Sequence, residues 1–165
     1  MIEQRGGTEE NLSIRLMTEE TYKILLKRRK EIGKELGELG AKRESGHQRA
    51  AIHDDVGTEH EKNMMRAKLT MIGDLSSVKI IKPPEEITSV LLGTEVELEY
   101  NDGHRLKALL LGPDDAITLE DRTVISYKSP LGSTILNKSV GEEVEIKVKS
   151  NLLKVKIIDI SKGNF

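Results

Sequence analysis

The sequence predicts an α+β protein, in which an N-terminal antiparallel helical hairpin is followed by a small antiparallel sheet with one short helix. Three observations support this fold class. Apolar residues in the first half recur every three or four positions, as on one helix face. Pro83-Pro84 then ends the pattern, because proline cannot continue a helix. Beyond the prolines, apolar and polar residues alternate, which is typical of strands with one buried face.

The chain divides into three predicted segments. Residues 1–17 are polar and without period, and we expect a flexible arm; residues 18–82 are expected to form the hairpin and residues 83–165 the sheet domain. If residues 18–53 were fully helical, the first helix would span roughly 54 Å. We expect the two helices to join near 54–58, with the reversal at Gly57. Two apolar ladders mark the helices: Tyr22, Leu25, Ile32, Leu36 and Leu39, then Met65, Leu69, Ile72 and Leu75.

The second half contains two predicted strand pairs. Residues 95–100 and 106–111 flank the turn 101–103, and residues 144–149 and 153–157 flank the turn 150–151. Between these pairs, residues 129–136 are expected to form a loop that leads into a short helix.

The composition excludes several kinds of site. The 165 residues include no Cys, no Trp, three Tyr and one Phe. Disulfides, zinc-thiolate sites and cysteine nucleophiles are therefore excluded, and an aromatic platform for single-stranded nucleic acid is not indicated. The 26 basic and 28 acidic residues do not suggest bulk attraction to DNA. Because there is neither an apolar run of roughly 20 residues nor a signal-peptide pattern, we expect a cytoplasmic protein without a membrane partner.

An acidic segment lies where the hairpin should turn. Residues 50–61 contain Asp54, Asp55, Glu59 and Glu61 but no Lys or Arg. Carboxylates are hard oxygen ligands that suit Mg²⁺, although acids near a helix start can equally cap and solubilise it.

Metal binding by histidine is a further alternative. The reversal expected between His53 and His60 argues against it, and exposed histidine is the default; His47 and His104 complete the set.

Two stretches of the second half carry a family resemblance. Residues 111–116 read Leu-Gly-Pro-Asp-Asp-Ala, and residues 126–144 begin Ser-Tyr-Lys-Ser-Pro-Leu-Gly and end Val-Gly-Glu-Glu-Val. At this spacing, after a predicted helical hairpin, the chain resembles the bacterial GreA/GreB transcript cleavage factors. The resemblance implies that the hairpin is a coiled-coil finger and that the sheet domain is FKBP-like.

The resemblance also implies a function. In that family the finger enters the secondary channel of bacterial RNA polymerase, and acidic tip residues complete a Mg²⁺ site shared with the polymerase. The polymerase then cleaves its own backtracked RNA, so the factor is a cofactor and not itself an enzyme. Asp54, Asp55 and Glu59 would be the catalytic acids, with Asp54 and Asp55 as metal ligands. Ser129, Pro130, Leu131 and Gly132 would dock on the channel rim. We expect a monomer that reaches the 3′ end of nascent RNA only indirectly and does not bind Mg²⁺ in isolation.

Two alternatives remain open. Thr58 occupies the position at which the family tip pattern has Glu, and Glu59 follows one residue later. A regulator that occupies the channel without stimulating cleavage therefore fits the sequence as well. An FKBP-like fold also admits a prolyl isomerase. Such an enzyme needs an aromatic-lined pocket, and the second half offers only Tyr100, Tyr127 and Phe165.

Overall fold

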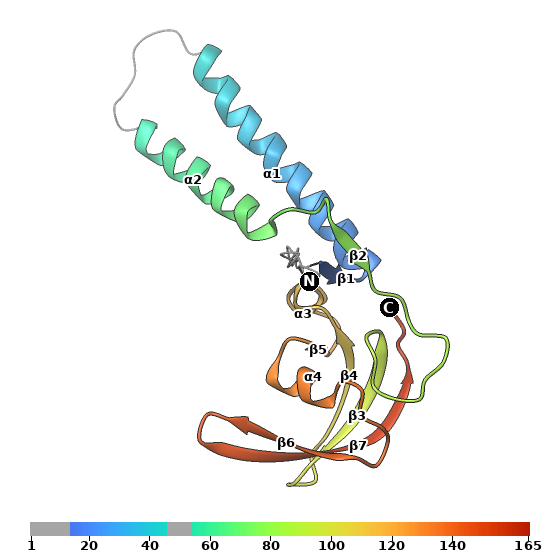
Figure 1. Ribbon diagram of the computed structural model, residues 1–165. Helices are drawn as coiled ribbons and strands as arrows, with labels where there is room; N and C mark the ends of the chain where they lie inside the picture. Colours follow the sequence, from blue (N-terminus) through green and yellow to red (C-terminus); the bar gives the residue numbers. More distant parts are fainter. Residues whose placement is uncertain (1–13, 46–53) are drawn as a thin grey trace, which may run out of the picture.

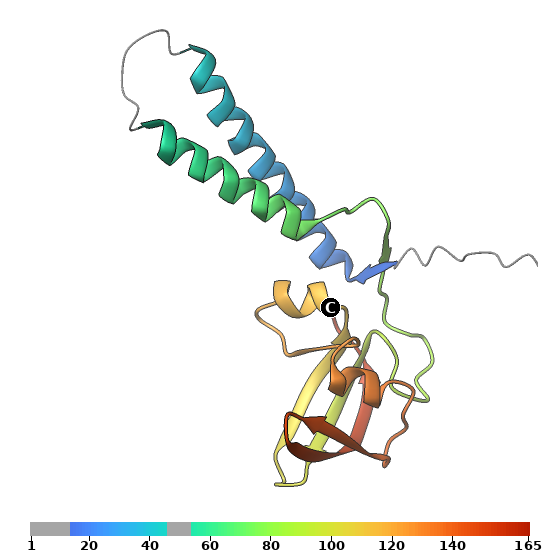
Figure 2. The same cartoon turned by 60° about the vertical axis from the view of Figure 1, so that its left-hand side comes forward.

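The computed structural model describes residues 14–45 and 54–165. A helical hairpin projects from a small sheet domain, and the two parts meet at the base of the hairpin (Figures 1 and 2). The predicted α+β class is confirmed. In chain order the elements are β1 Arg15–Met17, α1 Glu19–Ser45, α2 Asp54–Ile72, β2 Val78–Ile80, β3 Thr94–Tyr100, β4 Arg105–Leu111, α3 Pro113–Thr118, β5 Val124–Ser126, α4 Pro130–Ile135, β6 Glu143–Val148 and β7 Asn151–Lys162.

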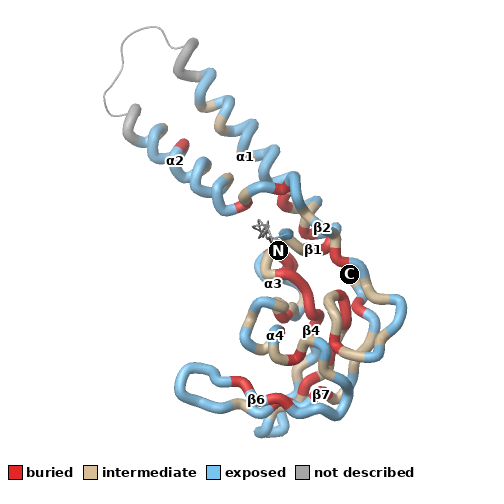
Figure 3. Tube along the Cα trace, in the orientation of Figure 1, coloured by how far each residue is buried: buried red, intermediate tan, exposed pale blue. Residues whose placement is uncertain are grey.

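The predicted ladders form the seam of the hairpin. All nine ladder residues are buried or half-buried, whereas most charged residues between them are exposed. Burial is deepest at the base, where Leu25, Ile72 and Leu75 surround the fully buried Met17. Farther out, the described part of the hairpin is mostly exposed (Figure 3). The hairpin is therefore anchored mainly by its base.

The predicted position of the helix reversal is wrong. The helix expected over 18–53 ends at Ser45, and α2 begins at Asp54, so Gly57 lies inside a helix and not at a turn. The connection falls on residues 46–53, outside the described residues. The sequence offers a physical reason, because Asp54 and Asp55 favour a helix N-terminus.

Part of the predicted flexible arm is a strand. Arg15–Met17 form β1, which pairs in parallel with β2, and the Ile81 amide donates to the Met17 carbonyl at 2.8 Å. Met17 is 0% exposed, so the segment contributes to the core at the finger base. Burial of this side chain explains why a segment without sequence period is nevertheless ordered.

The sheet domain contains five strands in the order β5-β4-β3-β7-β6. All neighbours are antiparallel except β4 and β5, which are parallel. The parallel pair and α3 add to the sheet and single helix expected from the sequence. Alternation buries Val96 and Leu98 beside Val155 and Ile157, and Ile135 of α4 completes this core. One face of the sheet is thus apolar, and α4 packs against it.

Candidate functional site

The predicted tip acids lie at the start of α2. Asp54 is its first residue and Asp55 its second, at the end of the finger away from the sheet domain (Figure 1). A spacing of four residues places Asp55 and Glu59 on the same helix face, one turn apart. The side chains of Asp54 and Asp55 lie outside the described part of the structure, which therefore gives the helical register of these acids and not their contacts.

Glu59 is the tip acid with a described side chain. Its carboxylate is half exposed, and Oε2 lies 3.9 Å from Lys62 Nζ. The Lys62 side chain is only 9% exposed, although it carries a charge. The exposed side of the Glu59 carboxylate stays open to solvent, so its oxygens can still accept a further ligand. Because Lys62 is almost fully buried, complete loss of its partner would leave a buried charge uncompensated.

Histidine does not build a metal centre in the part of the chain that is described. Among the side chains that the structure describes, no three His, Asp or Glu residues are grouped to hold a metal ion. His60 is exposed on α2, and His104 is exposed beside Tyr100, with ring centroids 6.0 Å apart. His47 and His53 lie outside the described residues.

The predicted docking residues form the start of α4, and three of them have clear local structural roles. Ser129 is the N-cap: its Oγ accepts from the Gly132 amide at 3.0 Å and donates to the Ser126 carbonyl at 2.7 Å. Pro130 occupies the first helical position, where its missing N–H costs nothing. Gly132 is buried, and a Cβ there would collide with the Ser126 carbonyl oxygen. Leu131 is half-buried against the core, whereas Pro130 is exposed.

The aromatic rings do not converge on one pocket. Tyr100 and Tyr127 pack at the edge of the main core, whereas Phe165 packs in a separate cluster with Leu111 and Leu119. Partial burial raises the pKa of Tyr100 above its ordinary value. This separation gives no support to the prolyl isomerase alternative.

Sequence reasoning missed a polar junction between the finger base and α3. Asp115 is 0% exposed and accepts three hydrogen bonds: from the Thr18 amide at 2.9 Å, from Thr18 Oγ1 at 2.7 Å and from the Gly112 amide at 3.0 Å. Arg122 adds an ion pair to Glu20 at 3.1 Å. The Gly-Pro-Asp-Asp sequence at 112–115 was a usable signal, since proline at the first helical position followed by acids is typical of a helix start.

Comparison with known proteins places these features in a family. Residues 84–162 match the family model described as "Transcription elongation factor, GreA/GreB, C-term". A transcription elongation factor GreA from Treponema pallidum (strain Nichols) is 30% identical over 134 residues, covering 80% of this chain and 77% of the relative. The chain belongs to the GreA/GreB family. The GreA/GreB model match includes Asp115 and the start of α4, but it does not reach the finger.

Another similar protein carries a different functional name. The "Transcription inhibitor protein Gfh1" of Thermus aquaticus is 29% identical over 112 residues, covering 66% of this chain and 71% of that protein. A solved structure of the transcription factor Gfh1 is 25% identical with a TM-score of 0.40, covering 88% of this chain and 96% of that chain. GreA/GreB relatives of this chain thus include both named elongation factors and a named inhibitor.

The described helices include no candidate for a membrane span, because none is both long and apolar enough.

Proposed function

We propose that this GreA/GreB-family protein acts on RNA polymerase. In this proposal the finger enters the secondary channel and stimulates Mg²⁺-dependent cleavage of backtracked nascent RNA. The observation that carries the proposal is the start of α2 at Asp54, which places an acidic helix end at the far end of the finger. The finger is also long, since the 27 residues of α1 span about 40 Å.

The tip residues have the chemistry that a shared magnesium site requires. Asp54, Asp55 and Glu59 supply hard oxygen donors, and Mg²⁺ in proteins takes one or two carboxylates while it keeps several waters. When bound, a second metal ion activates water and stabilises the leaving oxygen of the displacement. The positive end of the α2 dipole stabilises carboxylates in the first turn in their charged form. The role of this chain is to carry those charged acids to the polymerase.

The start of α4 is the proposed docking surface on the channel rim. Ser129 and Gly132 hold the turn in shape, and Pro130 lies exposed on its outer side. Lys128 is also exposed, and its ammonium group lies 5.8 Å from the centroid of the Tyr127 ring. A rigid turn is suited to docking because little side-chain or backbone freedom remains to be lost on binding.

A cleavage assay tests the proposal. A cognate elongation complex is stalled in a backtracked register, and release of the RNA 3′ fragment is followed with and without the protein. We expect faster cleavage with the wild type and none above background with Asp55→Ala, while polymerase binding persists in both. Glu61→Gln is the matched control, because Glu61 is an exposed acid on the same helix. Full activity in Asp55→Ala would show that another acid carries the role.

A second candidate function is channel occupancy without cleavage. Two observations favour it: Thr58 stands where the family tip pattern has Glu, and a 29% identical relative is named as a transcription inhibitor. This candidate predicts polymerase binding and competition with a secondary-channel ligand, with cleavage left at its basal rate. The same assay therefore separates the two functions.

A further inference from the structure

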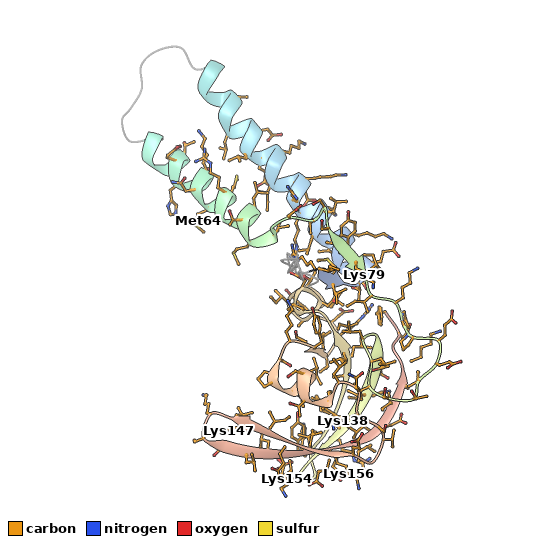
Figure 4. The ribbon with its side chains drawn as sticks, in the orientation of Figure 1. Met64, Lys79, Lys138, Lys147, Lys154 and Lys156 are labelled. Atoms are coloured by element: carbon orange, nitrogen blue, oxygen red, sulfur yellow. The ribbon has the colours of Figure 1, made fainter. Side chains whose placement is uncertain are left out.

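The end of the β6–β7 hairpin carries a cluster of lysines. Residues 146–156 read Ile-Lys-Val-Lys-Ser-Asn-Leu-Leu-Lys-Val-Lys, with four Lys and no Asp or Glu, although the whole chain has a net charge of −2. Figure 4 labels Lys147, Lys154 and Lys156 along this hairpin. The turn at the hairpin end is exposed throughout (Figure 3). The charge is therefore concentrated on one projecting element.

Neighbouring acids compensate the lysines near the sheet but not those at the tip. Lys154 Nζ lies 3.3 Å from Glu145 Oε1, and Lys156 is in register with Glu143 on one side and Glu99 on the other. Within the described chain, Lys147 and Lys149 take part in no ion pair. The lysines without an ion-pair partner in the described chain therefore lie at and next to the turn.

The same tip exposes aliphatic side chains on both faces. Val148 is 44% and Leu152 55% exposed. Val148 continues the inward face of Val144 and Ile146 beyond the end of the core, while Leu152 lies opposite Lys147 on the outer face. Lys149, with a φ of 56°, makes the tight turn between them. The hairpin end thus forms a narrow wedge with one exposed aliphatic side chain on each face, with Lys147 beside Leu152 on the outer face and Lys149 at the turn.

We propose that this wedge, formed by Lys147, Val148, Lys149 and Leu152, binds an apolar recess rimmed by carboxylates on a protein partner. The inference rests on the proposed function, since it places that recess on RNA polymerase. It adds a contact separate from both the finger tip and the start of α4.

The side-chain chemistry favours a protein over a nucleic acid. A phosphate backbone would use the lysines but would leave Val148 and Leu152 without a partner. Residues 146–156 also contain no aromatic side chain for stacking and no Arg for bidentate base contacts. An apolar centre with a polar rim is the usual anatomy of protein interfaces.

A binding experiment with the full chain tests the wedge. The dissociation constant for cognate core RNA polymerase is measured over a range of salt concentrations. We expect Lys147→Glu/Lys149→Glu to bind roughly tenfold more weakly, with a smaller salt dependence, and Leu152→Ser to bind several-fold more weakly. Lys79→Glu is the matched control, because Lys79 is exposed on β2, away from the hairpin (Figure 4). Because all substituted side chains are exposed, thermal unfolding should be unchanged and serves as the folding check.

A photo-cross-linker at position 152 identifies the surface contacted. We expect cross-links to an acidic polymerase peptide, and none from the same group at position 117, where Ile117 is exposed on α3. Wild-type affinity in both hairpin variants overturns the wedge and leaves the proposed function standing. Absence of wild-type binding overturns both. Unchanged polymerase binding together with lost binding to an RNA or duplex DNA oligonucleotide assigns the lysines to phosphates, which also overturns the wedge.

Discussion

Arg15 and Asp114, 99 positions apart in the chain, form a bidentate ion pair that joins the finger base to α3. Arg15 Nε and Nη2 donate to the two carboxylate oxygens at 2.8 and 2.7 Å. Arg15 Nη1 also donates to the Ile72 and Asp74 carbonyls at 2.6 and 3.1 Å, at the end of α2. The hydrogen bonds to Asp114 raise the pKa of Arg15 above its ordinary value. The Arg15 side chain therefore links its own strand, β1, to the end of α2 and to α3.

Loss of this guanidinium should destabilise the finger base. We expect Arg15→Ala to lower the free energy of unfolding by about 2 kcal/mol, because bidentate charge-assisted bonds to a part-buried carboxylate are lost. Chemical denaturation measures the change, with Lys79→Ala as an exposed control. In a double-mutant cycle with Asp114→Ala, a coupling energy near zero would contradict the assigned pair.

Replacement of the Asp115 carboxylate by an amide should destabilise the protein. Asp115 is fully buried, and its donors among the described residues are Thr18 and Gly112. In Asp115→Asn one acceptor becomes an NH₂ group that faces N–H or O–H donors, and we expect a loss of about 2–3 kcal/mol in unfolding free energy. Urea denaturation provides the measurement. The exposed Asp121, changed to Asn, should leave the midpoint unchanged; equal effects of the two substitutions would argue against the buried network.

Two glycines should respond in opposite directions to alanine. Gly37 lies inside α1, and no neighbouring atom lies within 4 Å of the position that an alanine methyl group would take, so Gly37→Ala should stabilise the helix by about 1 kcal/mol. Gly132→Ala should destabilise the protein because the methyl group meets the Ser126 carbonyl. Thermal unfolding, monitored by circular dichroism, compares the two variants. A lower melting temperature for Gly37→Ala would contradict the open helical position assigned to Gly37.

Glu142 should titrate at an unusually low pH. The Ser139 amide donates to its Oε2 at 2.6 Å, and this bond, with Lys138 nearby, lowers the pKa of Glu142 below the ordinary glutamate value. Because the folded state then binds the proton less readily than the unfolded state, the stabilisation is present at neutral pH and is lost as pH falls through the folded-state pKa. An NMR titration of the carboxyl carbon checks the direction. Glu142→Gln should flatten the acid limb of the stability profile, and an unchanged limb would contradict the assignment.

The sequence predicted those parts of the fold that depend on local periodicity. The hairpin seam from Tyr22 to Leu39 and the alternation in β3 and β7 could be recognised, since each repeats over several residues. β1 could not, because three residues have no measurable period and Arg15 is held by a partner 99 positions away. The reversal predicted at Gly57 is wrong because Asp54 and Asp55 start a helix, and a glycine in open space is tolerated inside it.

The two parts of the candidate site, the start of α4 and the finger tip, could be predicted from the sequence to different extents. Ser129, Pro130 and Gly132 form a local N-cap whose pattern spans four residues, so its turn could be expected from the sequence. The acids at 54, 55 and 59 could be placed near the finger end by composition alone. Their metal-binding role stays a prediction, because it depends on groups supplied by another molecule.

The placement of α3 has a mechanical consequence. Its adjacent residues Asp114 and Asp115 hold the strand that enters the finger and the residue that precedes its first helix. A load applied at the far end of the finger is therefore passed to the sheet domain partly through this six-residue helix, together with the Arg122–Glu20 ion pair. Substitutions in α3 should consequently change the angle between the finger and the sheet domain without altering the tip residues themselves.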